Sequence, residues 1–392
     1  MRVSIIGQGY VGLPLAIASA SAGHEVLGVD INKVLIEKLN TGKSPIFDIS
    51  DKEISHALTS KHYTASSDFT LISTSEIVVI CVPTPLDVEQ KPDLTLLKSA
   101  LKSVADNMQD NTLVIVESTI SPGTTRGLIS SILKSSGAKY ELAYSPERID
   151  PANTEWNVTN TPKLLAGLTP HATKKALKFY QSFVKEVVAG ESVEVIETAK
   201  LLENTFRLIN ISFINELAEF CWKMKIDVRE VIKAASSKPY GFMPFYPGAG
   251  VGGHCIPVDP SYLSEKAREL GASTSFIDLA NKVNGNLPTH FANVVLEILG
   301  EITGKKILIV GVAYKPNVAD TRETPALGLI QSFRTRGAEV SWHDQLVGEW
   351  MGEKSVPLSS DYDLAILVNV HTNMDLSHLQ STKILDVRGG YL

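Results

Sequence analysis

VSIIGQGYVG at residues 3–12 sets the architecture of the first half of the chain. A short apolar run at residues 3–6 leads into the three glycines of a G-x-G-x-x-G turn. The small apolar residues 13–22 predict a buried helix, and EVLGVD at residues 25–30 predicts a second strand that ends in an acid. Strand, glycine turn, helix, strand and acid within about thirty residues form a dinucleotide-binding fingerprint, which is much more specific than the glycines alone.

The same stretch predicts which cofactor the chain binds. The glycine backbone lets a pyrophosphate approach the amides at the helix N-terminus, where the helix dipole favours an anion. Asp30 would accept hydrogen bonds from ribose hydroxyls and repel a 2′-phosphate, so the sequence favours NAD over NADP. A glycine turn that arises by chance is the alternative interpretation. The cofactor residues predicted here are Gly7, Gly9, Tyr10, Val11, Gly12 and Asp30.

Polar residues follow each of the next three predicted strands, which are residues 76–82, 112–117 and 141–144. Ligands bind at the carboxyl ends of the strands in an open α/β sheet, so these tips predict a site along one edge of a doubly wound domain. Capping of a helix is the alternative for the glutamate among them. Cys81 lies inside the first strand and is expected to pack. The polar tips are Thr84, Thr119 and Glu147.

Residues 194–235 change the pattern, because apolar residues recur there at helical spacing without proline. Long helices are expected, and such helices between two sheet domains suit a subunit interface. Lys200 and Asn204 are four residues apart and share one helix face. From this spacing alone, a surface ion pair of Lys200 with Glu197 or Glu203 is the favoured interpretation.

GAGVGGHCIPVDP at residues 248–260 contains the chain's most distinctive loop. Its glycines bring the backbone close to a neighbour, and Cys255 follows them directly. Asp259 lies four residues further on, between two prolines that stiffen the loop. This pattern suits a nucleophilic thiol held against a substrate, while a tight turn with a structural cysteine is the alternative.

A second α/β pattern begins at residue 307, with strands expected at 307–313, 339–344, 363–368 and 384–387. Helices are expected at 262–281 and 326–336. This second pattern lacks the G-x-G-x-x-G turn, so we expect a different nucleotide there. Lys315 and Arg322 follow its first strand and would suit a phosphate, although a solvated surface loop is the alternative.

The composition narrows the class of protein. A chain of 392 residues fits two or three domains, and 44% hydrophobic with 20% charged residues is typical of a soluble globular protein. The net charge of −6 disfavours a nucleic-acid partner. Three scattered cysteines indicate a reducing compartment. We expect a cytoplasmic protein with no membrane span, no signal peptide and no metal site.

Taken together, the sequence resembles the UDP-glucose/GDP-mannose dehydrogenase family along nearly its whole length. No single motif carries this resemblance, because it depends on their combination and order. The matching stretches are GQGYVGLP at 7–14, CVPTP at 81–85, EST at 117–119, SPER at 145–148, AKLLEN at 199–204, GVGGHCIPVDP at 250–260 and GVAYKPNVADTRETP at 311–325.

The resemblance implies two Rossmann-like doubly wound domains joined by a central long-helix domain. Residues 1–193 would bind NAD, residues 194–295 would dimerise and carry the Cys255 loop, and residues 296–392 would bind the UDP-sugar. It also implies oxidation of the C6 alcohol of a nucleotide sugar to a carboxylate, by two hydride transfers and a thiol-bound intermediate. A homodimer or a higher homo-oligomer is expected.

The resemblance also implies roles for individual residues. Cys255 would be the nucleophile, and Lys200 and Asn204 would stabilise a negative oxygen. Asp259 would handle protons in the alcohol step, and Glu147 would help water hydrolyse the thioester. Thr119 would position that water and would also contact the cofactor. Thr84 and Arg322 would contact the cofactor only. The substrate contacts implied are Arg148, Lys200, Asn204, Phe245, Tyr246, Gly253, Tyr314, Lys315 and Arg388.

Departures from the UDP-glucose branch narrow the substrate. Residues 238–247 contain no arginine, where many UDP-glucose enzymes place one. Arg148 and Pro151 stand where that branch has phenylalanine and a second glutamate, and IPVDP replaces a lysine-bearing version. These features resemble the branch that oxidises UDP-N-acetylhexosamines. We therefore expect UDP-N-acetylglucosamine first, UDP-N-acetylmannosamine second and UDP-glucose third.

Two functions of other classes remain open at this stage. A one-step β-hydroxyacid dehydrogenase would share the first domain and a helical middle, but would need neither Cys255 nor a second α/β domain. A nucleotide-sugar sensor without catalysis would bind a UDP-sugar and form no NADH. The number of NADH molecules formed per sugar separates all three functions.

Overall fold

Two compact units make up the chain, with their boundary between Leu202 and Glu203. The computed structural model describes residues 1–389. The boundary falls inside helix α7 (Val193–Met224), so this helix begins in the N-terminal unit and ends in the C-terminal unit.

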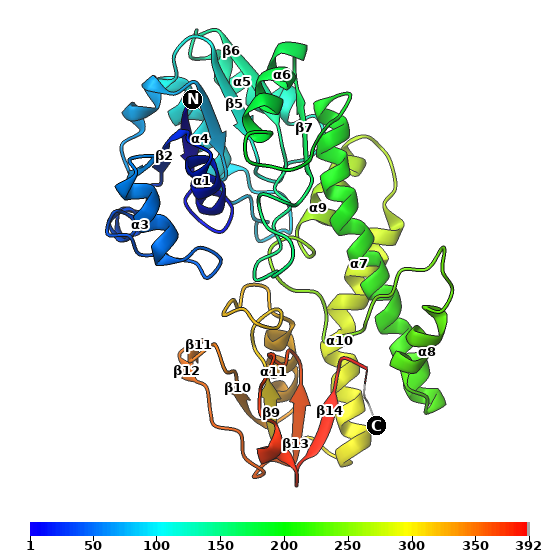
Figure 1. Cartoon of the computed structure of the whole chain (residues 1–392). Helices are drawn as coiled ribbons and strands as arrows, with labels where there is room; N and C mark the ends of the chain where they lie inside the picture. The colour runs from blue at the N-terminus through cyan, green and yellow to red at the C-terminus, as the bar shows by residue number, and fades with distance from the viewer. Residues whose placement is uncertain (390–392) are drawn as a thin grey trace. The chain divides into compact units, whose positions relative to one another are not determined.

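An eight-stranded sheet forms the centre of the N-terminal unit, in the order β3-β2-β1-β4-β5-β6-β7-β8 (Figure 1). Strands β1 to β6 run parallel, β7 pairs antiparallel with β6, and β8 pairs parallel with β7. The strands are β1 (Arg2–Ile6), β2 (Glu25–Val29), β3 (Tyr63–Ser66), β4 (Ile77–Ile80), β5 (Thr112–Val116), β6 (Tyr140–Tyr144), β7 (Lys163–Gly167) and β8 (Val187–Ala189). The helices are α1 (Gly12–Ser21), α2 (Lys33–Asn40), α3 (Asp51–Thr59), η1 (Phe69–Thr74), α4 (Thr95–Asn107), η2 (Thr125–Ile129), α5 (Ser130–Lys134) and α6 (Pro170–Tyr180).

Side chains alternate between the two faces of this sheet, and each face has its own core. Ile5, Val79 and Ile115 pack on one face with residues of α1, α3 and α6. Ile6 and Val116 pack on the other face with α4 and α5. Because both faces are covered, the central strands are apolar throughout, as the sequence predicted.

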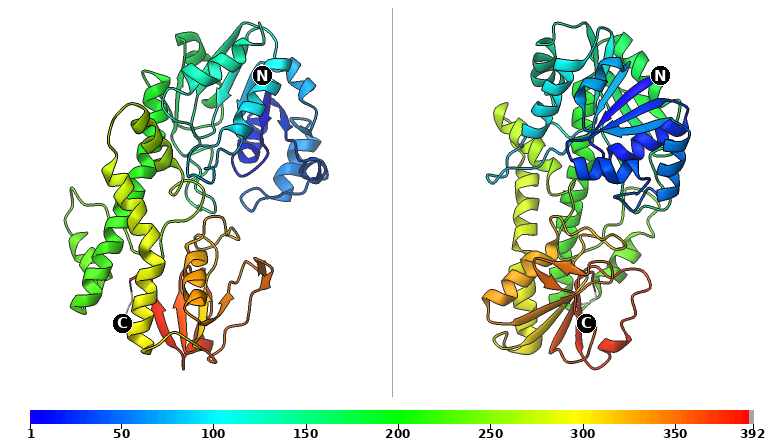
Figure 2. Two further views of the ribbon diagram at one scale, coloured as in Figure 1. Left: turned by 180° about the vertical axis from the view of Figure 1, so that it is seen from behind. Right: turned by 90° about the vertical axis from the view of Figure 1, so that its left-hand side faces the viewer.

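A four-stranded parallel sheet in the order β10-β9-β13-β14 forms the centre of the C-terminal unit, and Figure 2 shows it from two further sides. The strands of this unit are β9 (Lys306–Val310), β10 (Glu339–His343), β11 (Glu349–Trp350), β12 (Glu353–Lys354), β13 (Leu364–Leu367) and β14 (Lys383–Asp386). Its helices are the second part of α7, α8 (Val228–Ala235), α9 (Asp259–Glu269), α10 (Ser275–Leu299), α11 (Pro325–Thr335) and η3 (Ser377–Leu379).

Helices α10 and α11 cover one face of this second sheet. Phe291 of α10 and Phe333 of α11 are fully buried in one cluster with Ile307, Ile309 and Ile366 of the strands. Leu308, Val310 and Leu379 belong to the cluster on the opposite face. The sheet is therefore buried on both faces, by α10 and α11 on one side and by side chains of residues 356–379 on the other.

One predicted helix differs from the structure. Residues 262–281 do not form a single helix, since α9 ends at Glu269 and α10 starts at Ser275. Gly271, with a φ of 72°, lies in the left-handed region and breaks the helix there. Helix α10 then continues through Pro288 to a left-handed cap at Gly300.

The predicted fold class is confirmed, with two Rossmann-like sheets and a central region of long helices including α7. Strands β3, β7 and β8 were not predicted; KLLAG of β7, at 163–167, is short and begins with a lysine. The exact bounds of the three domains stay a prediction.

Candidate active site

The glycine turn between β1 and α1 leaves room for a ligand at the start of the helix. Gly7 has a φ of 89°, and a Cβ there would lie 2.6 Å from the carbonyl oxygen of Cys81. A Cβ on Gly12 would lie 1.8 Å from the carbonyl oxygen of Gly7. A Cβ on Gly9 would meet nothing within 4 Å, so the outer side of the turn is open. The turn therefore fits a pyrophosphate on the α1 amides.

Asp30 closes this turn from the end of β2. Its carboxylate accepts hydrogen bonds from the backbone N–H of Gln8 (2.8 Å) and of Asn32 (2.9 Å). The side chain of Gln8 is buried and accepts a 2.8 Å hydrogen bond from the hydroxyl of Tyr63. Sequence reasoning missed Gln8 and Tyr63. The available signal was Gly28 inside a strand, because a Cβ there would lie 2.4 Å from Gln8.

The polar tips expected at the sheet edge follow neighbouring strands. Thr84 follows β4, Thr119 follows β5 and Glu147 follows β6, and these strands are adjacent in the sheet. Arg148 lies next to Glu147, and its Nη1 donates a 2.7 Å hydrogen bond to the carbonyl of Pro162. The topology thus brings four predicted site residues to one edge, which the glycine turn after β1 shares.

Cys81 lies at the end of β4, and its surroundings disfavour a nucleophilic role. Burial and the nearby carboxylate of Glu117 raise the pKa of its thiol well above the ordinary range. The thiol therefore stays protonated at neutral pH. This agrees with the expected packing role.

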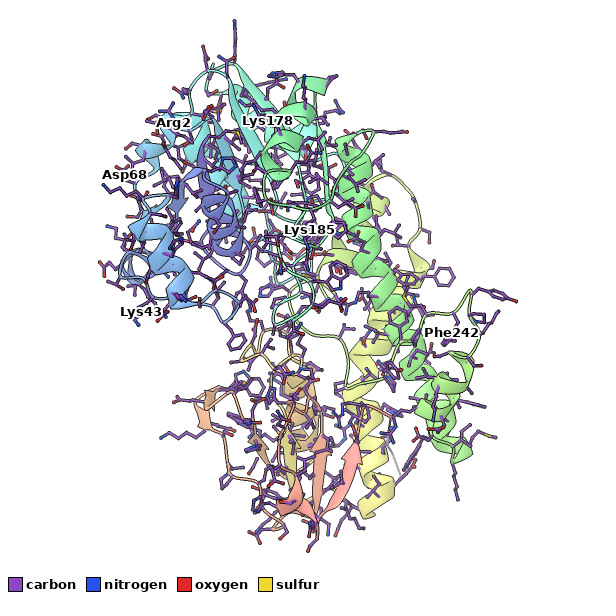
Figure 3. The ribbon with its side chains drawn as sticks, in the orientation of Figure 1. Arg2, Lys43, Asp68, Lys178, Lys185 and Phe242 are labelled. Carbon is purple, nitrogen blue, oxygen red and sulfur yellow. The ribbon has the colours of Figure 1, made fainter. Side chains whose placement is uncertain are left out.

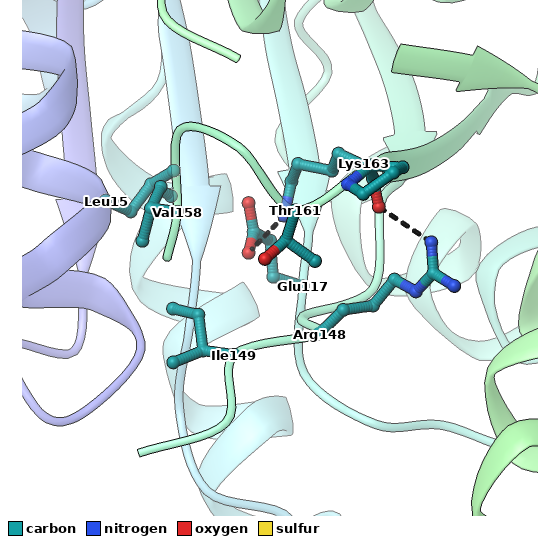
Figure 4. Close-up of a pocket in the computed structure, with 8 residues that line it drawn as sticks. Leu15, Glu117, Arg148, Ile149, Val158, Thr161 and Lys163 are labelled. Atoms are coloured by element: carbon teal, nitrogen blue, oxygen red, sulfur yellow. Dashed lines mark hydrogen bonds and ion pairs between the residues drawn. The ribbon is translucent and has the colours of Figure 1, made fainter. Parts of the chain in front are cut away.

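Glu117, Lys163 and Tyr180 form a buried polar network behind the polar tips. Glu117 accepts hydrogen bonds from Lys163 Nζ (2.9 Å) and from the hydroxyl of Tyr180 (2.5 Å). A cavity of about 20 Å³ adjoins this network and is the size of roughly one water molecule (Figure 4). Sequence reasoning missed Lys163, since its partner Glu117 lies 46 residues earlier in the chain.

Helix α7 carries Lys200 and Asn204 one turn apart. Lys200 is 5% exposed, so it does not lie on the surface, where the ion pair favoured from helix spacing would place it. Glu197, one of its expected partners, is fully buried and accepts hydrogen bonds from the backbone N–H of Gly123 and Thr125. Burial raises the pKa of Glu197, against the opposing effect of these hydrogen bonds.

Asn204 and Asp259 meet in the C-terminal unit. Asn204 Nδ2 donates a 2.6 Å hydrogen bond to Asp259 Oδ2, and both side chains are buried. Asp259 is the first residue of α9, and its backbone N–H donates to the carbonyl oxygen of Cys255 at 2.9 Å. The half-buried thiol of Cys255 is thus one turn before the helix that begins with Asp259.

The glycines before Cys255 allow the loop that follows β9 to pack directly against their backbone. A Cβ on Gly253 would lie 2.7 Å from the ring of Tyr314, and one on Gly252 would lie 2.7 Å from the carbonyl oxygen of Glu323. The N–H of Gly253 also donates to the carbonyl oxygen of Arg322 at 3.3 Å. The neighbour that the sequence pattern required is therefore the segment 314–323 of the same chain.

The two predicted arginines of the C-terminal unit, Arg322 and Arg388, each bind a carboxylate two residues earlier in the chain. Arg322 Nε lies 2.9 Å from both carboxylate oxygens of Asp320, and Arg388 Nε lies 2.8 Å from Asp386. Arg322 is near the Cys255 loop through its backbone. Arg388 follows β14, and a Cβ on its neighbour Gly389 would lie 3.0 Å from the side chain of Arg229; the substrate role of Arg388 stays a prediction.

A buried Asp344–His371 pair supports the loop with Tyr314 and Lys315. Asn317 N–H donates to His371 Nδ1 (2.8 Å), which leaves the Nε2 proton to be donated to Asp344 (2.9 Å). Asp344 also accepts hydrogen bonds from the N–H groups of Val312 and Ala313. Burial would raise the pKa of Asp344, but hydrogen bonds from His371 and from backbone N–H groups outweigh it and lower this pKa to about 2.

This pair predicts a loss of stability in acid. The folded pKa of about 2 lies below the ordinary 3.8, so the stabilisation is complete above pH 3.8 and is lost as the pH falls through about 2. It amounts to roughly 2 kcal/mol. We expect the difference in thermal midpoint between wild type and Asp344→Asn to narrow from pH 5 to pH 2. A difference that stays constant over this range would contradict the assignment.

Phe245 and Tyr246 lie on the loop after α8, near the apolar side of α7. The rings of Phe245 and Phe206 lie 5.6 Å apart, edge to face, and Tyr246 is exposed. Figure 3 labels Phe242 on the same loop. Phe245 also packs against the cluster that contains Ile214 and Ile232. The substrate role of Phe245 and Tyr246 stays a prediction.

Family models match three successive parts of the chain. They are the NAD binding domain at residues 1–184, the central domain at 194–286 and the UDP binding domain at 308–388, all of one family. The chain belongs to the UDP-glucose/GDP-mannose dehydrogenase family. The predicted family, its NAD cofactor and its enzyme class are confirmed: the protein is an NAD-dependent UDP-sugar dehydrogenase.

The proteins similar to this chain include dehydrogenases named for two different UDP-N-acetylhexosamines. A UDP-N-acetyl-D-mannosamine dehydrogenase of Pyrococcus horikoshii is 34% identical over 356 residues, covering 88% of this chain and 84% of the relative. A UDP-N-acetyl-D-glucosamine 6-dehydrogenase of Pseudomonas aeruginosa is 32% identical over 389 residues, covering 95% and 91%. The solved structure of a UDP-D-ManNAc dehydrogenase from P. horikoshii superposes with a TM-score of 0.91 at 31% identity, covering 99% of this chain and 95% of that one. Among residues 1–389, no helix is long and apolar enough to cross a membrane.

Asp30 is expected to set the preference for NAD in this family member. Replacement by serine removes the charge that would repel a 2′-phosphate, which is worth on the order of 1 kcal/mol or more near a surface. We expect Asp30→Ser to raise kcat/KM for NADP relative to NAD by about tenfold. Asp106→Ser, on the exposed side of α4, is the control. An unchanged ratio in Asp30→Ser would show that this carboxylate does not select the cofactor.

Proposed function

We propose that this dehydrogenase oxidises the C6 alcohol of a UDP-N-acetylhexosamine to a carboxylate, through an acyl group carried by Cys255. The observation that supports it most is the buried hydrogen bond from Asn204 of α7 to Asp259, which begins α9 four residues after Cys255. An amide donor, a carboxylate and a half-buried thiol are the groups that oxyanion stabilisation, proton transfer and nucleophilic attack require.

The overall reaction balances with NAD as the oxidant. The alcohol carbon loses four electrons as two hydrides, water supplies the second carboxylate oxygen, and three protons are released. When bound, NAD supplies the hydride acceptor for both oxidations. The open turn from Gly7 to Gly12 and the carboxylate of Asp30 are the features that fit it.

Asp259, Lys200 and Asn204 would serve the alcohol step. The carboxylate of Asp259 takes the hydroxyl proton, through a water molecule and with Lys200. The ammonium of Lys200 and the amide of Asn204 stabilise the negative charge on the C6 oxygen. The burial of Lys200 and Asn204 supports this role, because a charged donor is most effective away from bulk water.

Cys255, Glu147 and Thr119 would serve the aldehyde step. An aldehyde carbon cannot give up a hydride before a nucleophile adds to it, so the sulfur of Cys255 adds and forms a thiohemiacetal. Loss of the second hydride leaves a thioester. Water positioned by Thr119 then adds to the acyl carbon, Glu147 takes a proton from it, and the carbon–sulfur bond breaks with the electron pair on sulfur.

Two sequence features support the proposed substrate class: the absence of arginine before the Cys255 loop, and an arginine directly after Glu147. Residues 238–247 contain no arginine, and Arg148 follows Glu147. Relatives named for UDP-N-acetylmannosamine and for UDP-N-acetylglucosamine are both about equally similar to this chain. We propose UDP-N-acetylglucosamine first and its manno epimer second, ahead of UDP-glucose.

A panel of nucleotide sugars tests the proposed substrate class. It holds UDP-N-acetylglucosamine, UDP-N-acetylmannosamine, UDP-glucose and GDP-mannose, each assayed for NADH formation at matched concentrations. We expect the highest kcat/KM with one of the two N-acetylated sugars. A higher value with UDP-glucose or GDP-mannose would overturn the substrate class while leaving the enzyme class untouched.

We propose further that a second copy of this chain covers the apolar side of α7. A cavity of about 460 Å³ there is lined by Phe206, Asn210, Phe213, Ile214, Gly241, Phe242, Met243 and Phe245. Phe213 is 60% exposed, and Phe220 and Met224 extend the apolar strip along the helix. Aromatic residues and methionine are enriched in protein interfaces, which supports a homodimer through this helix.

A charge placed in this strip is expected to separate the dimer. Phe213→Glu would desolvate a carboxylate in an apolar interface, which the interface cannot accommodate. Light scattering after size exclusion should give a dimer mass for wild type and a monomer mass for Phe213→Glu. Val34→Glu, also on an exposed helix face, should keep the wild-type mass. A dimer mass for Phe213→Glu would exclude this face as the interface.

The three cysteines form no disulfide among residues 1–389. Free thiols fit a reducing compartment. They support the proposed cytoplasmic location, where Cys255 would stay reduced and available for catalysis.

A further inference from the structure

Lys163 is a buried lysine at the start of β7, and its ammonium lies between a carboxylate and a backbone carbonyl. Its Nζ lies 2.9 Å from Glu117 Oε2 and 3.4 Å from the carbonyl oxygen of Pro146. The side chains of Lys163 and Glu117 are 10% and 1% exposed. The other oxygen of Glu117 accepts the hydroxyl of Tyr180, and the ammonium lies 4.9 Å from the centre of that ring.

These groups hold the segment Ser145–Arg148 from both sides. The ladder between β6 and β7 ends at Tyr144, so no strand pairing fixes the segment that follows. Hydrogen bonds to residues at the end of β5 and at the start of β7 hold this segment instead. They run from Ser145 N to Val116 O (3.0 Å), Ser145 Oγ to Leu164 O (2.8 Å), Lys163 Nζ to Pro146 O (3.4 Å), Glu147 N to Glu117 O (3.4 Å) and Arg148 Nη1 to Pro162 O (2.7 Å).

Of these hydrogen bonds, only the one from Lys163 to Pro146 has a buried charged side chain as its donor. Lys163 binds Glu117, which follows β5, and the carbonyl of Pro146, which directly precedes Glu147. It therefore ties the backbone before Glu147 to the end of the neighbouring strand. Figure 4 shows Lys163, Glu117 and Arg148 together, across the small cavity from Leu15 and Val158, with the 2.7 Å hydrogen bond of Arg148 as a dashed line.

We propose that Lys163, held by Glu117 and Tyr180, is a positioning residue for Glu147 in the hydrolysis of the thioester. This inference rests on the proposed function, in which Glu147 takes a proton from the attacking water. A carboxylate base works only within about 2.6–3.2 Å of its proton donor, so a displaced loop removes it from range. A shift of about 1 Å can cost roughly a hundredfold in rate.

The inference separates two parts of the reaction. Both hydride transfers precede hydrolysis and the second of them needs Cys255, while only the last step needs Glu147. In that step the water oxygen bonds to the acyl carbon, the carbon–sulfur bond breaks, and the sulfur leaves with the electron pair. Loss of Lys163 should therefore slow release of the acid and leave formation of NADH in the first turnover unchanged.

Rapid mixing with excess NAD and UDP-N-acetylhexosamine tests this separation. For Lys163→Met we expect two NADH per site in a burst at the wild-type rate, followed by a steady state slower by roughly tenfold to a hundredfold. Intact-protein mass spectrometry should show the acyl group on Cys255 during that steady state. Lys163→Arg, which keeps a charged donor, should restore the steady-state rate to within a few-fold of wild type. Lys175→Met removes another lysine bound to a backbone carbonyl, that of Asn111, and should behave as wild type.

A double variant distinguishes loss of positioning from loss of folding. Lys163→Met leaves the carboxylate of Glu117 buried without its cation, whereas the double variant Glu117→Gln/Lys163→Met buries no unpaired charge. The double variant should show the same burst and the same slow steady state. Burst and steady state that fall in proportion, or a steady state equal to wild type, would overturn the positioning role. A wild-type enzyme that forms one NADH per sugar would overturn the proposed function itself, and this inference with it.

Discussion

Replacing Cys255 by serine is expected to lower formation of the acid at least about a thousandfold. A serine hydroxyl is a much weaker nucleophile than a thiol at neutral pH, so the aldehyde would stay without a covalent partner and could not give up its second hydride. The variant should stall after the first oxidation or as a slowly formed ester. NADH formation and the mass of the protein after mixing with substrate measure both outcomes.

Cys221→Ser is the matched control for this experiment. Cys221 is a buried thiol that packs with Ile214, Ala218 and Val228, away from the polar residues of the loop. Its loss should leave kcat within a few-fold of wild type. Acid formation by Cys255→Ser at a rate near wild type would remove the covalent step from the account.

Replacing Lys200 by alanine is expected to lower kcat by roughly a hundredfold or more. This is the typical cost of losing one preorganised donor to a negative oxygen. The effect should fall on kcat rather than on the KM for the sugar, because the charge on the C6 oxygen develops only during the reaction. Steady-state kinetics with the preferred sugar measure this separation.

Lys223→Ala supplies the comparison on the same helix. Lys223 is exposed and forms a 3.1 Å pair with Glu219, one turn earlier on α7, so its loss should change kcat little. A near-normal kcat for Lys200→Ala would return Lys200 to a structural role. A loss that appears wholly in KM would instead make it a residue for binding alone.

The sequence predicted the architecture because it depends on local patterns. Apolar runs bounded by glycine or polar tips gave β1, β2, β4 and β5, since each strand is buried on both faces. The single helix expected over residues 262–281 failed at Gly271, where a left-handed conformation ended α9. Helical periodicity alone could not show that break, because the apolar residues on either side keep a similar spacing.

The site could be predicted only where motifs carried it. The glycines before Cys255 indicated a close neighbour, and the structure supplies Tyr314 and the carbonyl of Glu323. Helix spacing suggested the wrong environment for Lys200, because spacing along one helix cannot show what covers it. The bond from Lys163 to Glu117 joins two strands, and no pattern within either strand encodes it.

The amount of NADH formed per sugar consumed shows whether this one enzyme carries out both oxidations of the C6 carbon. The assay contains only the wild-type enzyme, NAD in excess and a limiting amount of the preferred UDP-N-acetylhexosamine. We expect two NADH for each sugar, with the uronic acid as the product and no free aldehyde. One NADH for each sugar, with an aldehyde released into solution, would contradict this expectation.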